Sequence, residues 1–352
     1  MRVVITGPTG AIGHALIAEC IKQNIEVLAI CHRGSKRAGL LADEVCRMLQ
    51  IKQNERLNCE SSNCKYLNSI DMPTLSSQYN IAETVNRLLK VEYLNLDEYA
   101  TGLNSGLLSH SETCDSNPYD IFFHMAWNGT AGELRNDEAL QQQNAAYSMD
   151  AVRLAKKLGC NTFVFAGSQA EYGRVEGKLT ADTATFPENE YGKYKLQAGK
   201  TTGALCEKLS IKHIWARILS VYGPYDSKNS MIMSAISKLR NGESAQFTKG
   251  EQQWDYLYSA DAANALLLAA VKGKHGSIYP IGSGRVRSLS EYIQILRNQI
   301  NPHANIELGA VPYAPKQVMY LCADISQLKE DTGFEPKTEF EDGICEILKL
   351  YE

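Results

Sequence analysis

Short apolar runs alternate with stretches of helical periodicity along the first two thirds of the chain. The opening run, Val3-Val4-Ile5, has no polar position, which is typical of a strand buried on both faces. Behind it, Ile12, Leu16 and Cys20 recur at helical spacing. Repeated alternation of this kind predicts an α/β fold with a parallel, doubly wound sheet. The predicted strands are residues 3–5, 27–30, 91–94, 121–125, 162–166 and 214–219, and the longer predicted helices are residues 138–158 and 191–209.

An insertion interrupts the alternation between the second and third predicted strands, at about residues 38–90. It carries two helical stretches, residues 40–50 and 81–90. The residues between them, 58–80, are rich in Asn and Ser and have few bulky apolar side chains to bury. We therefore expect a mobile surface segment at 58–80.

The pattern changes again after about residue 224, where the segments become shorter and contain more Gly, Pro and Tyr. This change predicts a first domain over residues 1–224 and a smaller lobe over residues 225–352. We expect a segment of the lobe, at about residues 254–272, to return to the first domain.

The composition narrows the class of protein. Of the 352 residues, 44% are hydrophobic and 22% are charged, which excludes disordered, collagen-like and coiled-coil chains. The formal charge is only -4 and no Lys/Arg block stands out, so we expect no nucleic-acid partner. No apolar run approaches the ~20 residues that cross a bilayer, and no signal sequence is visible, which predicts a cytoplasmic protein without a membrane partner. The spacing of Cys46, Cys59 and Cys64 favours free thiols over a zinc site.

Three glycines lie in phase between the first predicted strand and the helix that starts near Ala11. Gly7 suits a tight turn, Gly10 would let the backbone approach a diphosphate, and Gly13 would let the helix pack close on the strand. The helix N-terminus would then bind the diphosphate of a dinucleotide. A tight turn without a ligand is the alternative. The residues expected to contact the cofactor here are Gly7, Thr9, Gly10, Ala11, Ile12 and Gly13.

The residues after the second predicted strand indicate which dinucleotide is bound. An acidic residue there would hold the ribose 2′-hydroxyl of NAD. The chain instead has Arg33, followed by Lys36 and Arg37, and a guanidinium matches the geometry of a 2′-phosphate. We therefore expect NADP, with NAD as the alternative. A solvated basic loop without a ligand is the other interpretation of these cations.

Three further residues have the chemistry to move a proton. Tyr191 and Lys195 are four residues apart in a predicted helix and share one face, and Ser168 follows a predicted strand. The carboxyl ends of strands are where open α/β sheets bind ligands. During hydride transfer the Tyr191 hydroxyl would act as the acid or base, and Ser168 would bind the reacting oxygen. We expect the Lys195 ammonium to lower the pKa of Tyr191 and to hold the nicotinamide ribose.

In this order, the motifs resemble those of the extended short-chain dehydrogenase/reductase family, in its NAD(P)-dependent nucleotide-sugar epimerase, dehydratase and reductase branch. The resemblance covers nearly the whole chain. It implies a Rossmann-type sheet that binds NAD(P) in residues 1–224, a substrate-binding lobe in 225–352, and a homodimer. The matching landmarks are Thr6-Gly7-x-x-Gly10-x-x-Gly13, His124-Met125-Ala126, Ser168 before Tyr172-Gly173, Tyr191-x-x-x-Lys195, Val221-Tyr222-Gly223-Pro224 and Asp255-Tyr256-Leu257-Tyr258-x-x-Asp261.

The same resemblance assigns site residues and shows where the chain departs from the family. The acid pair that eliminates water in the dehydratases is replaced by Gln169 and Ala170, which cannot do acid–base chemistry. An Arg that grips the substrate diphosphate is Trp254 here, and an Asn before the Val-Tyr-Gly-Pro landmark is Ser220. The implied cofactor contacts beyond the glycine turn are Arg33, Asn95, Leu96, Ala126, Asn144, Tyr191 and Lys195; the implied substrate contacts are Ser168, Gln169, Asn128, Tyr191 and Ser220.

The function implied by the resemblance is NADP-dependent reduction of the C4 carbonyl of a nucleotide-diphosphate 4-keto-6-deoxy sugar. Ser168, Tyr191 and Lys195 would be its catalytic residues, and no metal is expected. An NAD-dependent nucleotide-sugar 4-epimerase that uses the same three residues is the alternative. A non-catalytic NADP-binding redox sensor is a third, although such sensors usually lack the Tyr/Lys pair.

Overall fold

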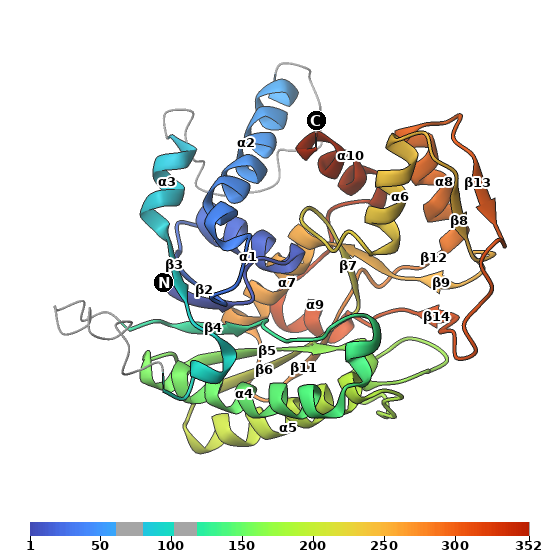
Figure 1. Cartoon of the computed structure of the whole chain (residues 1–352). Coiled ribbons are helices and arrows are strands. Elements are labelled where there is room, and N and C mark those ends of the chain that lie inside the picture. Colours follow the sequence, from blue (N-terminus) through green and yellow to red (C-terminus); the bar gives the residue numbers. More distant parts are fainter. Residues whose placement is uncertain (61–79, 102–117, 352) are drawn as a thin grey trace.

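The computed structural model describes residues 1–60, 80–101 and 118–351 and has a parallel sheet at its centre (Figure 1). The strands of this sheet are β1 (Arg2–Thr6), β2 (Glu26–Cys31), β3 (Leu89–Tyr93), β4 (Ile121–His124), β5 (Thr162–Ser168), β6 (Lys212–Ile218) and β11 (Ile278–Ile281). Their order is β11-β6-β5-β4-β1-β2-β3, so the direction of winding reverses between β1 and β4. Open α/β sheets bind ligands at such a switch point.

Helices cover both faces of the sheet. On one face α1 (Ala11–Lys22) packs against α7 (Ser259–Lys272), and on the other α4 (Glu138–Lys157) packs against α5 (Glu190–Lys208) (Figure 1). Neighbouring residues of a strand point to opposite faces. Val3 therefore belongs to the core under α1 and α7, whereas Val4 belongs to the core under α4 and α5. Burial on both faces is the physical reason for the apolar strand sequences.

Much of the chain after Tyr222 forms a smaller unit beside the sheet. Its apolar core gathers side chains from α6 (Met231–Arg240), α8 (Leu289–Ile300) and α10 (Phe340–Leu350). Several of its elements reach the first part of the chain: α7 lies on the sheet, β11 is an edge strand, and α10 contacts α2 (Leu41–Glu60). The remaining elements are α3 (Ile81–Leu88), α9 (Ser326–Thr332), β7 (Ser220–Tyr222), β8 (Ala245–Phe247), β9 (Gln253–Trp254), β10 (Tyr256–Tyr258), β12 (Arg287–Ser288), β13 (Ile306–Leu308), β14 (Tyr320–Leu321), and the short 3-10 helices η1 (Ala38–Leu40), η2 (Leu96–Glu98), η4 (Gly132–Asn136) and η5 (Gln169–Glu171).

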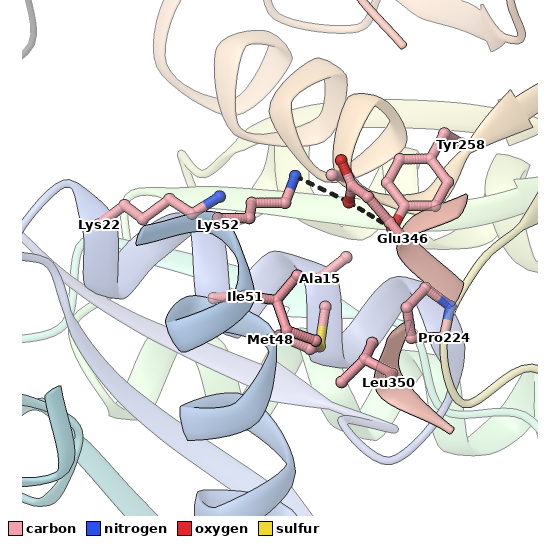
Figure 2. A pocket seen from close by; sticks show the side chains of 11 residues that line it. Ala15, Lys22, Met48, Ile51, Lys52, Pro224, Tyr258, Glu346 and Leu350 are labelled. Atoms are coloured by element: carbon pink, nitrogen blue, oxygen red, sulfur yellow. Dashed lines mark hydrogen bonds and ion pairs between the residues drawn. The ribbon is translucent and has the colours of Figure 1, made fainter. Parts of the chain in front are cut away.

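A small cavity lies where α1, α2 and α10 meet (Figure 2). Its volume of about 10 Å³ is close to that of a single water site. Glu346 of α10 accepts a hydrogen bond from the Tyr258 hydroxyl at 2.7 Å and pairs with Lys52 of α2 at 3.3 Å. Lys22 of α1 lines the same cavity. An ion pair therefore joins the C-terminal helix α10 to α2, with the Lys22 ammonium of α1 nearby.

The predicted α/β fold with a parallel sheet is confirmed, and the six predicted strands are all present within a few residues of their predicted limits. The helix predicted at 40–50 is longer than expected, since α2 continues to Glu60. Its residues Met48 and Ile51 line the cavity. Residues 58–60 of the predicted mobile segment are thus helical, residues 61–79 lie outside the described part of the chain, and the mobility of the segment stays a prediction. Within the described ranges, no helix has the length and apolar character needed to span a membrane.

Candidate active site

The turns after β1 and β4 approach each other closely at the switch point. Gly7 has a φ of +66°, and a Cβ at this position would lie 2.8 Å from the backbone nitrogen of Ala126. The Thr6 hydroxyl accepts the backbone N–H groups of Met125 at 3.2 Å and Ala126 at 3.3 Å. These contacts fix the two turns relative to each other and require glycine at position 7.

The N-terminus of α1 fits the diphosphate of a dinucleotide. Gly10 is its N-cap, no side chain caps the helix, and the first turn has no acidic residue. A Cβ at Gly10 would meet no atom within 4 Å, so open space lies in front of this turn. Backbone N–H groups at a helix N-terminus attract anions, and a diphosphate is such an anion. The other predicted contacts of this turn are Gly7, Thr9, Ala11, Ile12 and Gly13, and they lie in or beside it.

The predicted cofactor contacts Arg33 and Asn95 lie together after β2 and β3. The backbone N–H of Arg33 donates to Oδ1 of Asn95 at 2.9 Å. The guanidinium of Arg33 donates to the carboxylate of Glu98, with Nε–Oε1 at 3.1 Å and Nη2–Oε1 at 3.0 Å. Arg37 lies further along and donates to Glu44 at 3.4 Å. A 2′-phosphate would therefore meet Arg33 as part of an exposed ion pair rather than as an isolated cation.

Ser168 and Tyr191 meet at the carboxyl end of β5. Ser168 ends the strand, and its Oγ accepts the backbone N–H of Ala170 at 3.2 Å, which leaves the hydroxyl hydrogen available for donation. Asn189 caps α5 by accepting the backbone N–H of Gly192 at 2.8 Å, which fixes Tyr191 in the first turn of the helix. Ser168 is 9% exposed and Tyr191 is 8% exposed. Both hydroxyls are thus shielded from most of the solvent.

The acidity of Tyr191 differs from the prediction. Burial raises the pKa of its hydroxyl above the ordinary value of 10, and the groups that oppose this shift are the Ser168 hydroxyl and the Arg135 guanidinium. The Nζ atom of Lys195 lies 5.9 Å from the centroid of the Tyr191 ring. The pKa of Tyr191 is therefore raised rather than lowered as predicted, because burial has the largest effect on it. A contribution of the Lys195 ammonium stays a prediction.

Lys195 links α5 to β5. Its Nζ donates to the carbonyl oxygen of Ala166 at 2.7 Å and lies 3.9 Å from the centroid of the Trp127 ring. Burial lowers the pKa of Lys195 to about 7, and the carboxylate of Glu171 opposes this shift. An ammonium has three donors, so two remain after the bond to Ala166. These can hold ligand oxygens such as ribose hydroxyls.

A buried ion pair beside Ser168 was not predicted from the sequence. Glu171 is fully buried, and its carboxylate accepts the backbone N–H of Ser168 and the Nε–H of Arg217, each at 2.7 Å. Gly167 makes room for it, because a Cβ there would lie 2.6 Å from Oε1 of Glu171. Burial raises the pKa of Glu171, and Arg217 opposes this shift. The Ser-x-x-Glu spacing is a capping-box signal that could have revealed the first contact.

The remaining predicted contacts differ in their burial and in their hydrogen-bond partners. Asn144 is buried, and its side-chain amide bonds to the backbone N–H of Asn128 at 3.0 Å and to its carbonyl at 2.9 Å. Asn144 therefore positions the loop that carries the exposed Asn128. Ser220 accepts the indole N–H of Trp254 at 2.8 Å. The last two predicted contacts are Gln169, partly exposed in η5, and Leu96, buried in η2.

Comparisons with known proteins agree with this architecture. The chain is 26% identical to dTDP-4-dehydro-6-deoxyglucose reductase of Escherichia coli over 196 residues, which are 54% of this chain and 61% of that protein. It is also 26% identical to dTDP-glucose 4,6-dehydratase of Xanthomonas campestris over 200 residues, which are 54% of this chain and 57% of that protein. The chain thus spans about three fifths of the length of these curated relatives.

A solved structure and a family profile cover more of the chain. UDP-glucose 4-epimerase of Thermotoga maritima, solved with UDP-glucose, superposes with a TM-score of 0.75 at 19% identity and covers 100% of this chain and 98% of that one. This likeness establishes the fold. The profile of the NAD dependent epimerase/dehydratase family matches residues 3–282, which include the glycine turn, Ser168, Tyr191 and Lys195. The chain belongs to the NAD dependent epimerase/dehydratase family.

Proposed function

We propose that this protein is an NADP-dependent reductase that acts on the C4 carbonyl of a nucleotide-diphosphate 4-keto-6-deoxy sugar. The observation that carries the proposal is the meeting of the Ser168 and Tyr191 hydroxyls, beside Lys195, at the carboxyl edge of the sheet. Two hydroxyls in such a site can bind a carbonyl oxygen and deliver a proton to it. The family supports a nicotinamide dinucleotide as the other reactant.

The chain's own residues would share the work of the reduction. When bound, the nicotinamide would supply the hydride. Ser168 would donate a hydrogen bond to the carbonyl oxygen, because its Oγ already accepts the N–H of Ala170. Tyr191 would give its hydroxyl proton to the same oxygen as negative charge develops there. Lys195, anchored on Ala166, would hold the ribose and so orient the nicotinamide.

Reduction is favoured over elimination of water by the residues beside Ser168. Gln169 and Ala170 occupy the positions where the dehydratases have an acid pair, and neither side chain can exchange a proton at neutral pH. The nearest carboxylate, Glu171, is fully buried and paired with Arg217 at 2.7 Å. It is therefore unable to replace the missing acid. The similarity to a 4-dehydro-6-deoxy sugar reductase supports the same substrate class.

NADP is the proposed cofactor because of the cations after β2. No acidic residue ends this strand, and Arg33, Lys36 and Arg37 follow it within six positions of Cys31. The open N-terminus of α1 supports diphosphate binding. The proposed contacts are those predicted from the sequence, with Asn144 acting through the Asn128 loop.

The decisive experiment follows the absorbance of NADPH while a panel of nucleotide-linked 4-keto sugars is offered. Net consumption of NADPH that is lost in Tyr191→Phe supports the reductase. Interconversion of 4-hydroxy sugars without net consumption would instead establish the 4-epimerase. Tight NADPH binding without turnover of either the 4-keto or the 4-hydroxy sugars would favour the non-catalytic sensor. The homodimer and the cytoplasmic location stay predictions.

A further inference from the structure

The ion pair of Glu171 and Arg217 is held in a fixed position behind the end of β5. Both side chains are buried, and the guanidinium Nε donates to Oε2 of the carboxylate at 2.7 Å. The guanidinium also lies over the rings of Tyr172 and Trp215, with its carbon 4.6 Å from each centroid. The indole N–H of Trp215 donates to the same carboxylate at 3.4 Å. These contacts leave the carboxylate little freedom to move.

The carboxylate fixes the three residues that end β5. Its Oε1 accepts the backbone N–H of Ser168 at 2.7 Å. Gly167 packs directly against it, since a Cβ there would lie 2.6 Å from Oε1 of Glu171. One residue earlier, the carbonyl oxygen of Ala166 accepts the Nζ of Lys195 at 2.7 Å. Glu171 thus holds the strand end that carries one proposed site residue and anchors another.

We propose that Glu171 is a positioning residue, which fixes the end of β5 beneath Ser168 and supplies the negative charge that keeps Lys195 an ammonium. Desolvation disfavours the charged form of a buried lysine, so a buried ammonium needs a neighbouring negative charge. The inference rests on the proposed function, because the ammonium form of Lys195 is the one expected to hold the ribose and to favour ionisation of Tyr191. Glu171 touches neither substrate nor cofactor and acts through these residues.

The other groups packed around Lys195 do not supply this charge. From β4, His124 is neutral, because burial and the nearby ammonium lower its pKa to about 3. From α5, the phenol of Tyr191 stays neutral because burial raises its pKa. The Trp127 ring, 3.9 Å from Nζ, carries no net charge, and Arg135, which lies over the Tyr191 ring, is another cation. Among the described residues, the carboxylate of η5 is therefore the negative charge that acts on the ammonium.

The contacts of Glu171 favour its ionised form. Burial raises its pKa, whereas Arg217, the backbone N–H of Ser168 and the ammonium of Lys195 oppose this shift. A guanidinium keeps its proton in proteins, so a neutral Glu171 would leave Arg217 buried without a counter-charge. Each carboxylate oxygen accepts a hydrogen bond of 2.7 Å from a different donor, as an ionised carboxylate does. One carboxylate thus stabilises two buried cations.

The test follows the ionisation of Lys195 in the full-length protein and needs neither cofactor nor substrate. Lysine labelled with 13C at Cε is incorporated, NMR follows its titration, and the Lys195 signal is the one missing from Lys195→Met. In Glu171→Gln the midpoint should fall from about 7 by about one pH unit or more, the range for losing a neighbouring opposite charge. Glu171→Asp, which keeps the charge, should retain most of the original midpoint. Glu188→Gln, which removes an exposed carboxylate paired with Arg174, should leave it unchanged.

A double variant keeps the test valid if Glu171→Gln does not fold. Glu171→Gln combined with Arg217→Met leaves no unpaired guanidinium in the interior, and it should lower the Lys195 midpoint as the single variant does. Circular dichroism checks the fold of each variant. An unchanged midpoint in both would overturn the inference, as would an equal fall in Glu188→Gln. The titration stands even if the reductase assay fails, so the two proposals can fail separately. If the reductase is active, the alkaline limb of its pH profile should move downward in Glu171→Gln, because Lys195 would lose its proton at a lower pH.

Discussion

The indole N–H of Trp254 donates a hydrogen bond to the hydroxyl of Ser220 at 2.8 Å. These are the two positions at which the resemblance noted in the sequence implies a departure from the family's way of holding a substrate diphosphate. Trp254 lies in β9 and Ser220 in β7, 34 residues apart in sequence. The two departures are thus one structural feature, in which a neutral donor and a neutral acceptor satisfy each other.

This relationship predicts an asymmetric double-mutant cycle. Ser220→Ala leaves the partly buried indole N–H without its acceptor and should lower the free energy of unfolding by about 1–3 kcal/mol. Adding Trp254→Phe removes that donor, so Ser220→Ala should cost much less in the phenylalanine background. Urea denaturation of the four proteins measures the coupling. Additive losses would show that the hydrogen bond contributes nothing to stability.

The site geometry predicts how Tyr191 and Lys195 differ in function. Tyr191→Phe removes the proton donor and should lower turnover by ~10²-fold or more while leaving NADPH affinity nearly intact. Lys195→Met also removes the donors that remain beside Ala166, so it should reduce both turnover and NADPH affinity. Steady-state kinetics and NADPH fluorescence titration separate the two effects. Full activity in the phenylalanine variant would refute the proposed proton transfer.

Cofactor choice depends on Arg33 despite its contact with Glu98. The Arg33–Glu98 pair is exposed, with side chains 52% and 31% accessible, so solvent screens it and a phosphate can share the guanidinium. Arg33→Ala should weaken NADPH binding by ~10–100-fold and leave NADH almost unchanged. Arg153→Ala, which removes an exposed cation of α4, is the matched control. Equal losses for both cofactors would show that Arg33 does not contact the 2′-phosphate.

Local sequence was sufficient for six of the seven strands of the sheet and for the residues at their ends, whereas the edge strand β11 was not predicted. A strand buried on both faces has a continuous apolar sequence. Because Val3-Val4-Ile5 is followed at once by the glycine turn, the strand and the turn could be predicted from one stretch of sequence. Ser168 could be predicted because it ends such a run. Tyr191 and Lys195 could be predicted because a four-residue spacing places two side chains on one helical face.

The charges around these residues could not be read from local sequence. Arg135 lies 56 residues before Tyr191, on a short 3-10 helix without a periodic pattern, and its guanidinium carbon lies 4.3 Å from the centroid of the Tyr191 ring. Arg217 reaches Glu171 because β6 lies beside β5, with Gly167 opposite Arg217 in the register. Sequence spacing alone placed Lys195 beside Tyr191 but did not show that its ammonium turns toward Ala166.

The buried pair of Glu171 and Arg217 should be important for stability. Glu171→Gln keeps the shape but leaves the Arg217 charge buried without a counter-charge, which should lower the free energy of unfolding by about 3–5 kcal/mol. Glu188→Gln breaks the exposed pair with Arg174 and should change stability little. Thermal and urea denaturation compare the two variants. Similar small losses for both would mean that Arg217 is compensated by other groups, such as the Tyr172 and Trp215 rings on which it lies.

The cavity between α1, α2 and α10 predicts a pH-dependent stability (Figure 2). Burial and the neighbouring Lys52 lower the pKa of Lys22 from its ordinary value of 10.5 to about 8. Between these two values the unfolded chain binds more protons than the folded protein, so the free energy of unfolding rises with pH. Below about pH 8 the charge of Lys22 is present in both states and destabilises the folded one.

Lys22→Met should therefore stabilise the protein at pH 7, and the gain should fall as the pH rises from 8 and vanish above 10.5. Its size should be about 1–2 kcal/mol, less than the full shift implies, because the Lys22 side chain remains 23% exposed and partly solvated. Loss of the 3.5 Å contact between Lys22 and Glu19 should reduce this gain in stability only slightly. Urea denaturation at a series of pH values measures the gain, and Lys22→Arg, which keeps the charge, should not show it. A gain that persists unchanged above pH 10.5 would mean that methionine stabilises by filling the cavity rather than by removing a buried charge.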